Sequence, residues 1–126
     1  MRQLSDCGKK IRLNRVLGGS RRRALVVAFD HALVLGPIPG TEDPLEKIRQ
    51  FCQADIDSLL LNLGLIRQFA NSGATDSIPS LIARMDWTTV WSALGQNKSG
   101  ALYSSLVAHP EEALRHGADA VLTYLV

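Results

Sequence analysis

The chain has 126 residues, of which 46% are hydrophobic and 21% charged, with a net charge of +2. This length suits one domain of ordinary size, and the composition, near the average of soluble globular proteins, argues against intrinsic disorder. No apolar run approaches the length that crosses a membrane, and the small net charge gives no reason to expect nucleic acid as a partner.

The first 23 residues are locally basic, and residues 1–15 have no apolar core, so we expect no secretory signal. The basic side chains could bind phosphate groups or nucleic acid, or form a solvated helix face and a charged turn; we favour the second interpretation. They are Lys9, Lys10, Arg12, Arg15 and Arg21–Arg23. Cys7 and Cys52 lack metal-ligand spacing, so we expect reduced thiols in a cytoplasmic protein.

A leading helix is predicted within residues 1–20. Ser5 can serve as its N-cap, the helix runs to about Leu17, and Gly18 and Gly19 end it. Its apolar residues form only an incomplete stripe, so we place this helix on the outside of the domain.

A strand is predicted at Ala24–Phe29, followed directly by Asp30 and His31. Its apolar run is typical of a strand buried on both faces. Polar residues at the carboxyl end of such a strand are where α/β folds build active sites, so Asp30 and His31 are the candidate site residues. The alternatives are an aspartate that caps a turn and a histidine that belongs to the core.

Residues 32–43 contain two prolines and two glycines, which predicts a shaped loop long enough to cover a pocket. Asp43 then serves as the N-cap of a helix that ends near Ala54. Pro44 occupies the first helical position, and Glu46 falls three residues after the cap.

Further apolar runs predict more strands, which alternate with helical segments. The strands are Ser58–Asn62, Ser80–Met85 and Ala120–Val126, with strand character also at Ala101–Val107; the helical segments are a turn at Leu65–Phe69 and a short helix from Pro110 that Gly117 closes. This alternation predicts an α/β fold with a parallel sheet and right-handed crossovers.

Asp86 follows the third of these strands and places another polar side chain where a site could lie. Asp30, His31 and Asp86 could in principle bind a metal ion, but nothing in their spacing defines a third ligand, so we expect no metal site. Trp87 and Trp91 are interpreted as core or interface anchors rather than as a pair that stacks on nucleotides.

Several motifs, taken together in this order, resemble one enzyme superfamily. They are KKIRLNRVL (Lys9–Leu17), Asp30–His31, GPIPG (Gly36–Gly40), EDP (Glu42–Pro44), LLLNLGLIR (Leu59–Arg67) and HPEEALRHGADAV (His109–Val121). Over about residues 9–126 the chain resembles the archaeal-type (DhnA-like) class I fructose-bisphosphate aldolases. The same superfamily includes the transaldolase-like aminodideoxyheptulosonate synthase and the autoinducer-2 thiolase.

These relatives are (β/α)₈ barrels, which typically need about 250 residues. The resemblance therefore implies one partial domain over residues 1–126, in which residues 24–126 form about four β/α units, the N-terminal half of a TIM barrel. It also implies that Asp30 transfers protons during carbon–carbon cleavage and that His31 binds substrate oxygens. The family uses no cofactor or metal.

In this family the lysine that forms the Schiff base lies on the sixth barrel strand, which the resemblance places outside this chain. The lysines present are Lys9, Lys10, Lys47 and Lys98. We expect all of them to be solvated, whereas a Schiff-base lysine needs a pKa lowered by burial or by a cationic neighbour.

Three hypotheses follow. The first is the N-terminal part of a class I aldolase that cleaves a phosphorylated ketose such as fructose 1,6-bisphosphate, inactive alone and oligomeric when complete. The second is the corresponding part of the transaldolase-like synthase or of the thiolase. The third is a non-catalytic half-barrel whose open sheet edges bind a partner or the missing C-terminal half.

Overall fold

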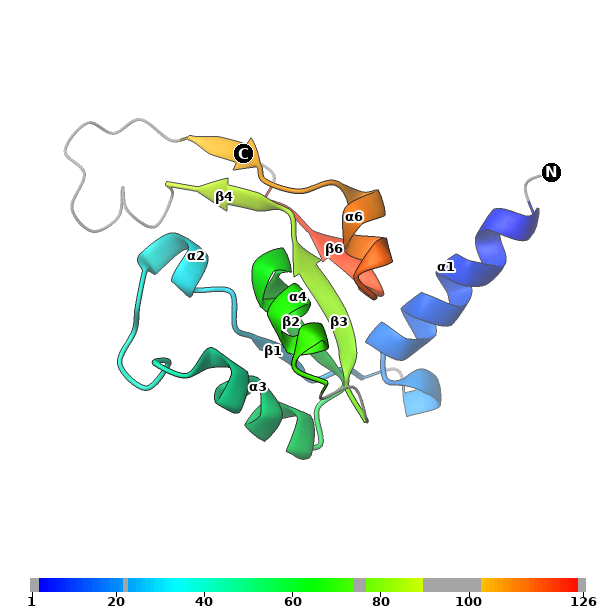
Figure 1. Cartoon of the computed structure of the whole chain (residues 1–126). Coiled ribbons are helices and arrows are strands. Elements are labelled where there is room, and N and C mark those ends of the chain that lie inside the picture. The colour runs from blue at the N-terminus through cyan, green and yellow to red at the C-terminus, as the bar shows by residue number, and fades with distance from the viewer. Residues whose placement is uncertain (1–2, 22, 74–76, 90–102, 125–126) are drawn as a thin grey trace.

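The computed structural model describes residues 3–21, 23–73, 77–89 and 103–124, and the side chains of residues 3–6 and 21 are not described. The chain forms an α/β fold around a parallel sheet (Figure 1). In chain order the elements are α1 (Gln3–Val16), η1 (Gly19–Arg21), β1 (Val26–Ala28), α2 (Ala32–Leu35), α3 (Pro44–Gln53), β2 (Ser58–Asn62), α4 (Leu63–Asn71), β3 (Ser80–Arg84), β4 (Asp86–Thr88), β5 (Ser104–Leu106), α6 (Pro110–Arg115) and β6 (Ala120–Leu122).

The four-stranded sheet has the order β1-β2-β3-β6, and every neighbouring pair is parallel. The register aligns Ala28, Leu60, Ile82 and Ala120 in one row across the sheet. The predicted parallel α/β sheet is therefore confirmed. Strands that follow one another in the sequence also lie side by side, as a partial TIM-like fold requires.

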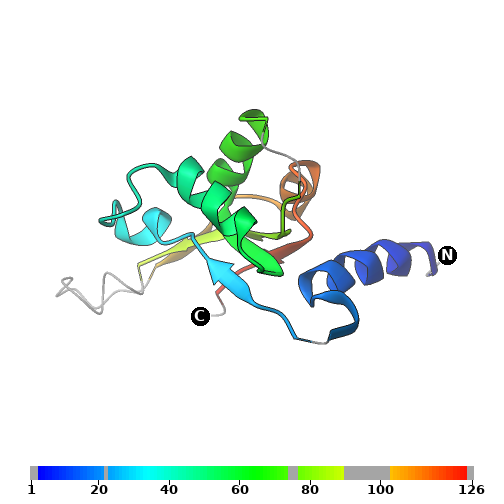
Figure 2. The same ribbon diagram turned by 90° about the horizontal axis from the view of Figure 1, so that it is seen from below.

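One face of the sheet carries the hydrophobic core. α3, α4 and α6 lie on that face (Figure 2). The sheet contributes Leu59, Leu61, Leu81 and Ala83, and the helices contribute Ile48, Leu65, Ile66, Phe69 and Ala113. Each fully buried leucine or isoleucine contributes roughly 1.5–3 kcal/mol, so this layer is the main source of stability.

The start of α3 agrees with the prediction. Asp43 Oδ1 accepts a hydrogen bond from the Glu46 backbone N–H at 3.0 Å, and Pro44 occupies the first turn. The helix ends at Gln53, with Ala54 as its C-cap. Phe51 packs edge-on against Phe29 at a centroid distance of 5.4 Å, which ties α3 to the end of β1.

α4 is longer than the predicted turn at Leu65–Phe69, since it covers Leu63–Asn71. Asn62, the last residue of β2, accepts a hydrogen bond from the Leu65 N–H at 2.9 Å through its side chain. This cap lets the helix begin directly after the strand, and the burial of Ile66 and Phe69 stabilises it despite Gly64.

Two predictions around β1 are wrong. The strand is limited to Val26–Ala28, and it is not buried on both faces, since Val26 and Ala28 are exposed and Val26 is 43% exposed. The predicted loop at residues 32–43 begins with a short helix, α2. The N–H groups of Leu33 and Val34 donate to the backbone carbonyls of Asp30 and His31.

The segment with strand character at Ala101–Val107 does not join the parallel sheet. Its described part, β5, pairs antiparallel with β4 in a separate two-stranded sheet above β3. Trp87 of β4 is 37% exposed, so it does not anchor the core. Trp91 lies outside the described residues.

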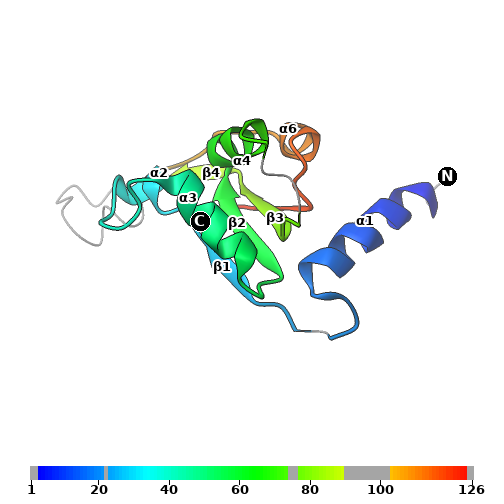
Figure 3. The same cartoon turned by 60° about the horizontal axis from the view of Figure 1, so that its bottom comes forward.

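α1 lies outside the domain, as predicted, although it begins at Gln3, which places Ser5 inside the helix rather than at its N-cap. It projects away from the sheet and approaches it only at its carboxyl end (Figure 3). There Ser58 Oγ donates to the Val16 carbonyl at 3.0 Å. Gly18 follows with φ of +67°, and a Cβ at this point would lie 2.6 Å from the Arg23 carbonyl oxygen, so glycine is required.

Cys7 and Cys52 form no disulfide, and burial raises the pKa of the Cys52 thiol. Lys9 and Lys10 are exposed on α1, which agrees with a solvated helix face. Within the described residues, each helix is too short or too polar to traverse a bilayer.

Candidate active site

Asp30 and His31 lie at the carboxyl end of β1, where the chain turns into α2. Both side chains line a cavity of about 420 Å³ on the sheet face opposite the helix-packed core. We call it the Asp30 cavity; its walls are Ala28, Asp30, His31, Val34, Leu35, Leu60, Arg84, Leu122 and Tyr124. The predicted site residues therefore lie together at the edge of the sheet where parallel α/β folds place their sites.

Arg84 is the residue of this cavity that sequence analysis missed. It ends β3 and is aligned with Asn62 and Leu122, yet its side chain is only 3% exposed. Arg84 Nη1 lies 3.4 Å from Asp30 Oδ2, and the Asp30 side chain is 13% exposed. A charged residue within the otherwise apolar run of β3 was the available signal, because buried arginines occur almost only where they are paired.

Asp86 forms a second ion pair with Arg84. Its Oδ1 lies 2.7 Å from Arg84 Nε, and its Oδ2 accepts a hydrogen bond from the Tyr124 backbone N–H at 2.7 Å. The Tyr124 ring covers the guanidinium, with Arg84 Cζ 3.6 Å from the ring centroid. Asp86 is buried and does not line the Asp30 cavity, so it acts on the site through Arg84.

A second cavity, of about 500 Å³, lies on the other side of His31. The segment from Pro37 to Pro44 forms one wall and the start of α4 the other, so the predicted loop does cover a pocket. Thr41 Oγ1 donates to the Ile38 carbonyl at 2.6 Å and closes the loop. The Gly40 N–H bonds Glu42 Oε1 at 3.0 Å, which lowers the pKa of this exposed carboxyl. This cavity is larger, whereas the Asp30 cavity holds the carboxylate that is ion-paired with Arg84.

Similarity to a curated protein gives this geometry a context. Over 119 residues the chain is 34% identical to an uncharacterized aldolase of Saccharolobus solfataricus. The match covers 94% of the chain but 43% of the relative, so the chain spans less than half of that protein's length. No protein-family model matches the chain.

The lysines in the described part of the chain do not line the Asp30 cavity. Lys9 and Lys10 are exposed on α1, and Lys47 on α3 donates to Gln50 Oε1 at 3.1 Å. Lys98 lies outside the described residues. In the described part of the chain, no three or more His, Cys, Asp or Glu side chains are grouped to hold a metal ion, so Asp30, His31 and Asp86 are not brought together as a ligand set.

Proposed function

We propose that this chain forms the first four β/α units of a class I aldolase barrel. In the complete enzyme, a lysine carried by a later strand forms a Schiff base with a phosphorylated ketose such as fructose 1,6-bisphosphate. Asp30 transfers the proton during carbon–carbon cleavage, and His31 binds substrate oxygens. The enzyme acts in the cytoplasm and associates with further copies of itself.

One observation carries the proposal. In a chain similar to an aldolase, an ion-paired carboxylate lines a cavity at the carboxyl ends of parallel strands. Essentially all (β/α)₈ enzymes place their chemistry at that end of the barrel. A positioned carboxylate next to a cavity is suited to general acid–base catalysis.

Length supports assigning the chain to the first part of a barrel. A (β/α)₈ barrel typically needs about 250 residues, and the described parallel sheet has four strands. The Saccharolobus aldolase extends well beyond the matched segment, since the match covers 43% of it. The missing strands would bring the amine nucleophile, because Lys9, Lys10 and Lys47 are placed outside the cavity.

The exposed sheet edges favour one second candidate, a non-catalytic half-barrel that binds another polypeptide. β1 and β6 are the edge strands, and Leu25, Val26 and Val121 are 57%, 43% and 45% exposed. Unpaired parallel edges with apolar side chains invite association.

A chimera separates the two candidates. This chain replaces the matching segment of the Saccharolobus aldolase, and the intact Saccharolobus protein is the positive control. We expect ketose phosphate cleavage, and borohydride reduction in the presence of dihydroxyacetone phosphate should leave a covalent adduct in the Saccharolobus-derived portion. A chimera that folds but neither cleaves nor traps the ketose supports the binding module, and an adduct on a lysine of this chain would refute the assignment of the nucleophile.

A further inference from the structure

The groups around the Arg84 guanidinium limit its movement but do not complete its hydrogen bonds. Its Nε lies 2.7 Å from Asp86 Oδ1, and the Tyr124 ring stacks on it with Cζ 3.6 Å from the centroid. The Nε–Oδ1 contact is an ion pair without hydrogen-bond geometry, and Nη2 is buried and has no hydrogen-bond partner among the described residues. Replacing a buried ion pair by apolar residues of similar size is often neutral or stabilising, so stability alone does not account for this arrangement.

The nitrogen that faces the site is Nη1, which lies 3.4 Å from Asp30 Oδ2. This separation is longer than the 2.7–3.2 Å of a typical hydrogen bond, so the contact is an ion pair that does not saturate the lone pairs of the carboxylate. Asp30 therefore keeps acceptor capacity on the cavity side. Asp86 cannot take the same role, because it is buried and does not line the Asp30 cavity.

Anion binding is the competing role for a cavity arginine, and the cluster disfavours it. One guanidinium stands beside two carboxylates, Asp30 and Asp86, so the local charge is negative and repels a phosphate. The unpartnered Nη2 is also inaccessible, and a ligand in the cavity cannot reach it.

We propose that Arg84 is a positioning residue, which holds the Asp30 carboxylate in one orientation at the Asp30 cavity while Asp86 and Tyr124 hold the guanidinium. The inference rests on the proposed function for its catalytic meaning. The orientation of Asp30 can be measured without any activity, so the two can fail separately.

The first measurement is the χ1 preference of Asp30, from three-bond couplings between its Cγ and the backbone nitrogen and carbonyl carbon in the labelled chain. We expect one rotamer in the native chain and averaged couplings in Arg84→Met/Asp86→Asn, which removes both buried charges together. Asp43, held by its N-cap bond on α3, is the internal control and should not change. A single Asp30 rotamer that survives in this variant overturns the proposal.

If the double variant does not fold, Arg84→Lys provides the test. Lysine keeps the charge but lacks the planar fork, so Asp30 couplings should move toward the averaged values, and unchanged couplings refute the proposal.

In the chimera, Arg84→Lys should lower kcat by about 10²-fold, the cost of a small misplacement of a catalytic group. Because Arg84 acts through Asp30, the same change should lower kcat no further in an Asp30→Asn background, and an additional loss there would contradict a positioning role.

Discussion

At the scale of single residues, the main feature of the candidate site is the position of the Asp30 carboxylate at the cavity. Asp30 follows an edge strand, and its side chain lines a cavity beside Arg84 rather than capping a turn. His31 separates the Asp30 cavity from the larger cavity beneath the loop, since it lines both. The roles proposed for these neighbours, proton transfer by Asp30 and oxygen binding by His31, both lie at the Asp30 cavity.

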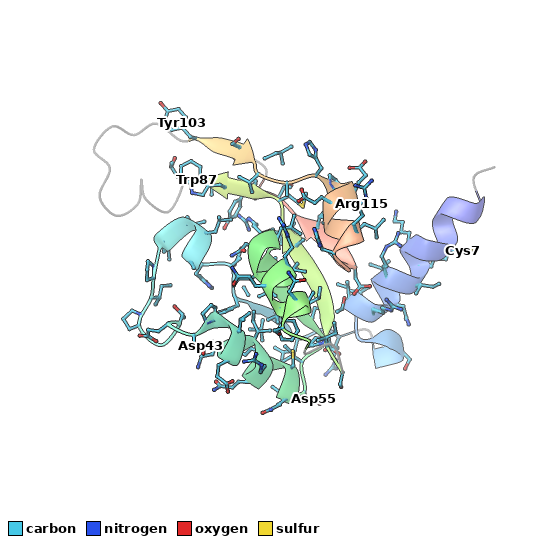
Figure 4. The ribbon with its side chains drawn as sticks, in the orientation of Figure 1. Cys7, Asp43, Asp55, Trp87, Tyr103 and Arg115 are labelled. Atoms are coloured by element: carbon cyan, nitrogen blue, oxygen red, sulfur yellow. The ribbon has the colours of Figure 1, made fainter. Side chains whose placement is uncertain are left out.

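Asp30→Ala tests the role of this carboxylate. In the chimera with the Saccharolobus aldolase we expect kcat to fall by roughly 10²–10⁴-fold, the usual contribution of a positioned acid or base. Steady-state cleavage kinetics measure the effect. The control is Asp55→Ala, because the Asp55 side chain is exposed near the carboxyl end of α3 (Figure 4). A near-normal rate for Asp30→Ala would remove Asp30 from the mechanism.

At the scale of elements, helix starts depend on single side chains. Asp43 caps α3 and Asn62 caps α4, each by accepting a backbone N–H three residues later. Both helices border the cavity that Pro37–Pro44 covers, so their caps also set the shape of that wall.

Asp43→Ala should lower the free energy of unfolding by about 1 kcal/mol, because an orphan N–H of the first turn loses its acceptor. Urea denaturation followed by circular dichroism measures this change. Asp55→Ala removes a carboxylate that lies close to the other end of α3 (Figure 4) and should leave the stability unchanged. Equal losses in the two variants would contradict a capping role for Asp43.

Ile48 tests how α3 is held on the sheet. It is fully buried in the core cluster, so Ile48→Ala should cost about 2–5 kcal/mol through lost burial and the cavity left behind. Ile11→Ala makes the same chemical change on α1, where the side chain is 57% exposed, and should cost far less. Thermal unfolding of both variants checks the difference; a similar cost for both would contradict the position of the core.

At the scale of the whole molecule, the parallel sheet has helices on one face and the Asp30 cavity on the other. Its edges, β1 and β6, carry exposed apolar side chains. In a closed barrel such edges are paired, so the isolated chain should associate through them.

Val121→Lys tests this edge. Val121 lies on β6 and is 45% exposed, so a lysine there should weaken self-association by charging the edge, with little change in stability. Analytical ultracentrifugation over a concentration series measures the association. Leu13→Lys on α1, at a side chain 49% exposed, is the matched control and should not alter it; an equal effect of both variants would place the contact elsewhere.

The features that the sequence alone determined are those set by local chemistry. The strand at Ser58–Asn62 was predicted with its observed bounds, since a short apolar run bounded by polar residues suits few other structures. The cap at Asp43 and the stop at Gly117 follow from hydrogen bonds and backbone angles within a few residues. The position of Asp30 and His31 at a strand end belongs to the same group.

Other features were decided only by contacts between distant segments. β5 has ordinary strand character, but its antiparallel pairing with β4, which aligns Ser105 with Trp87, joins it to a strand far away in the sequence. β1 was expected to be buried on both faces, but Val26 and Ala28 are exposed in the folded chain. Arg84 becomes part of the site because β1, β4 and the segment after β6 bring Asp30, Asp86 and Tyr124 around it. Local patterns determine elements, whereas the environment of a buried charge depends on how those elements pack.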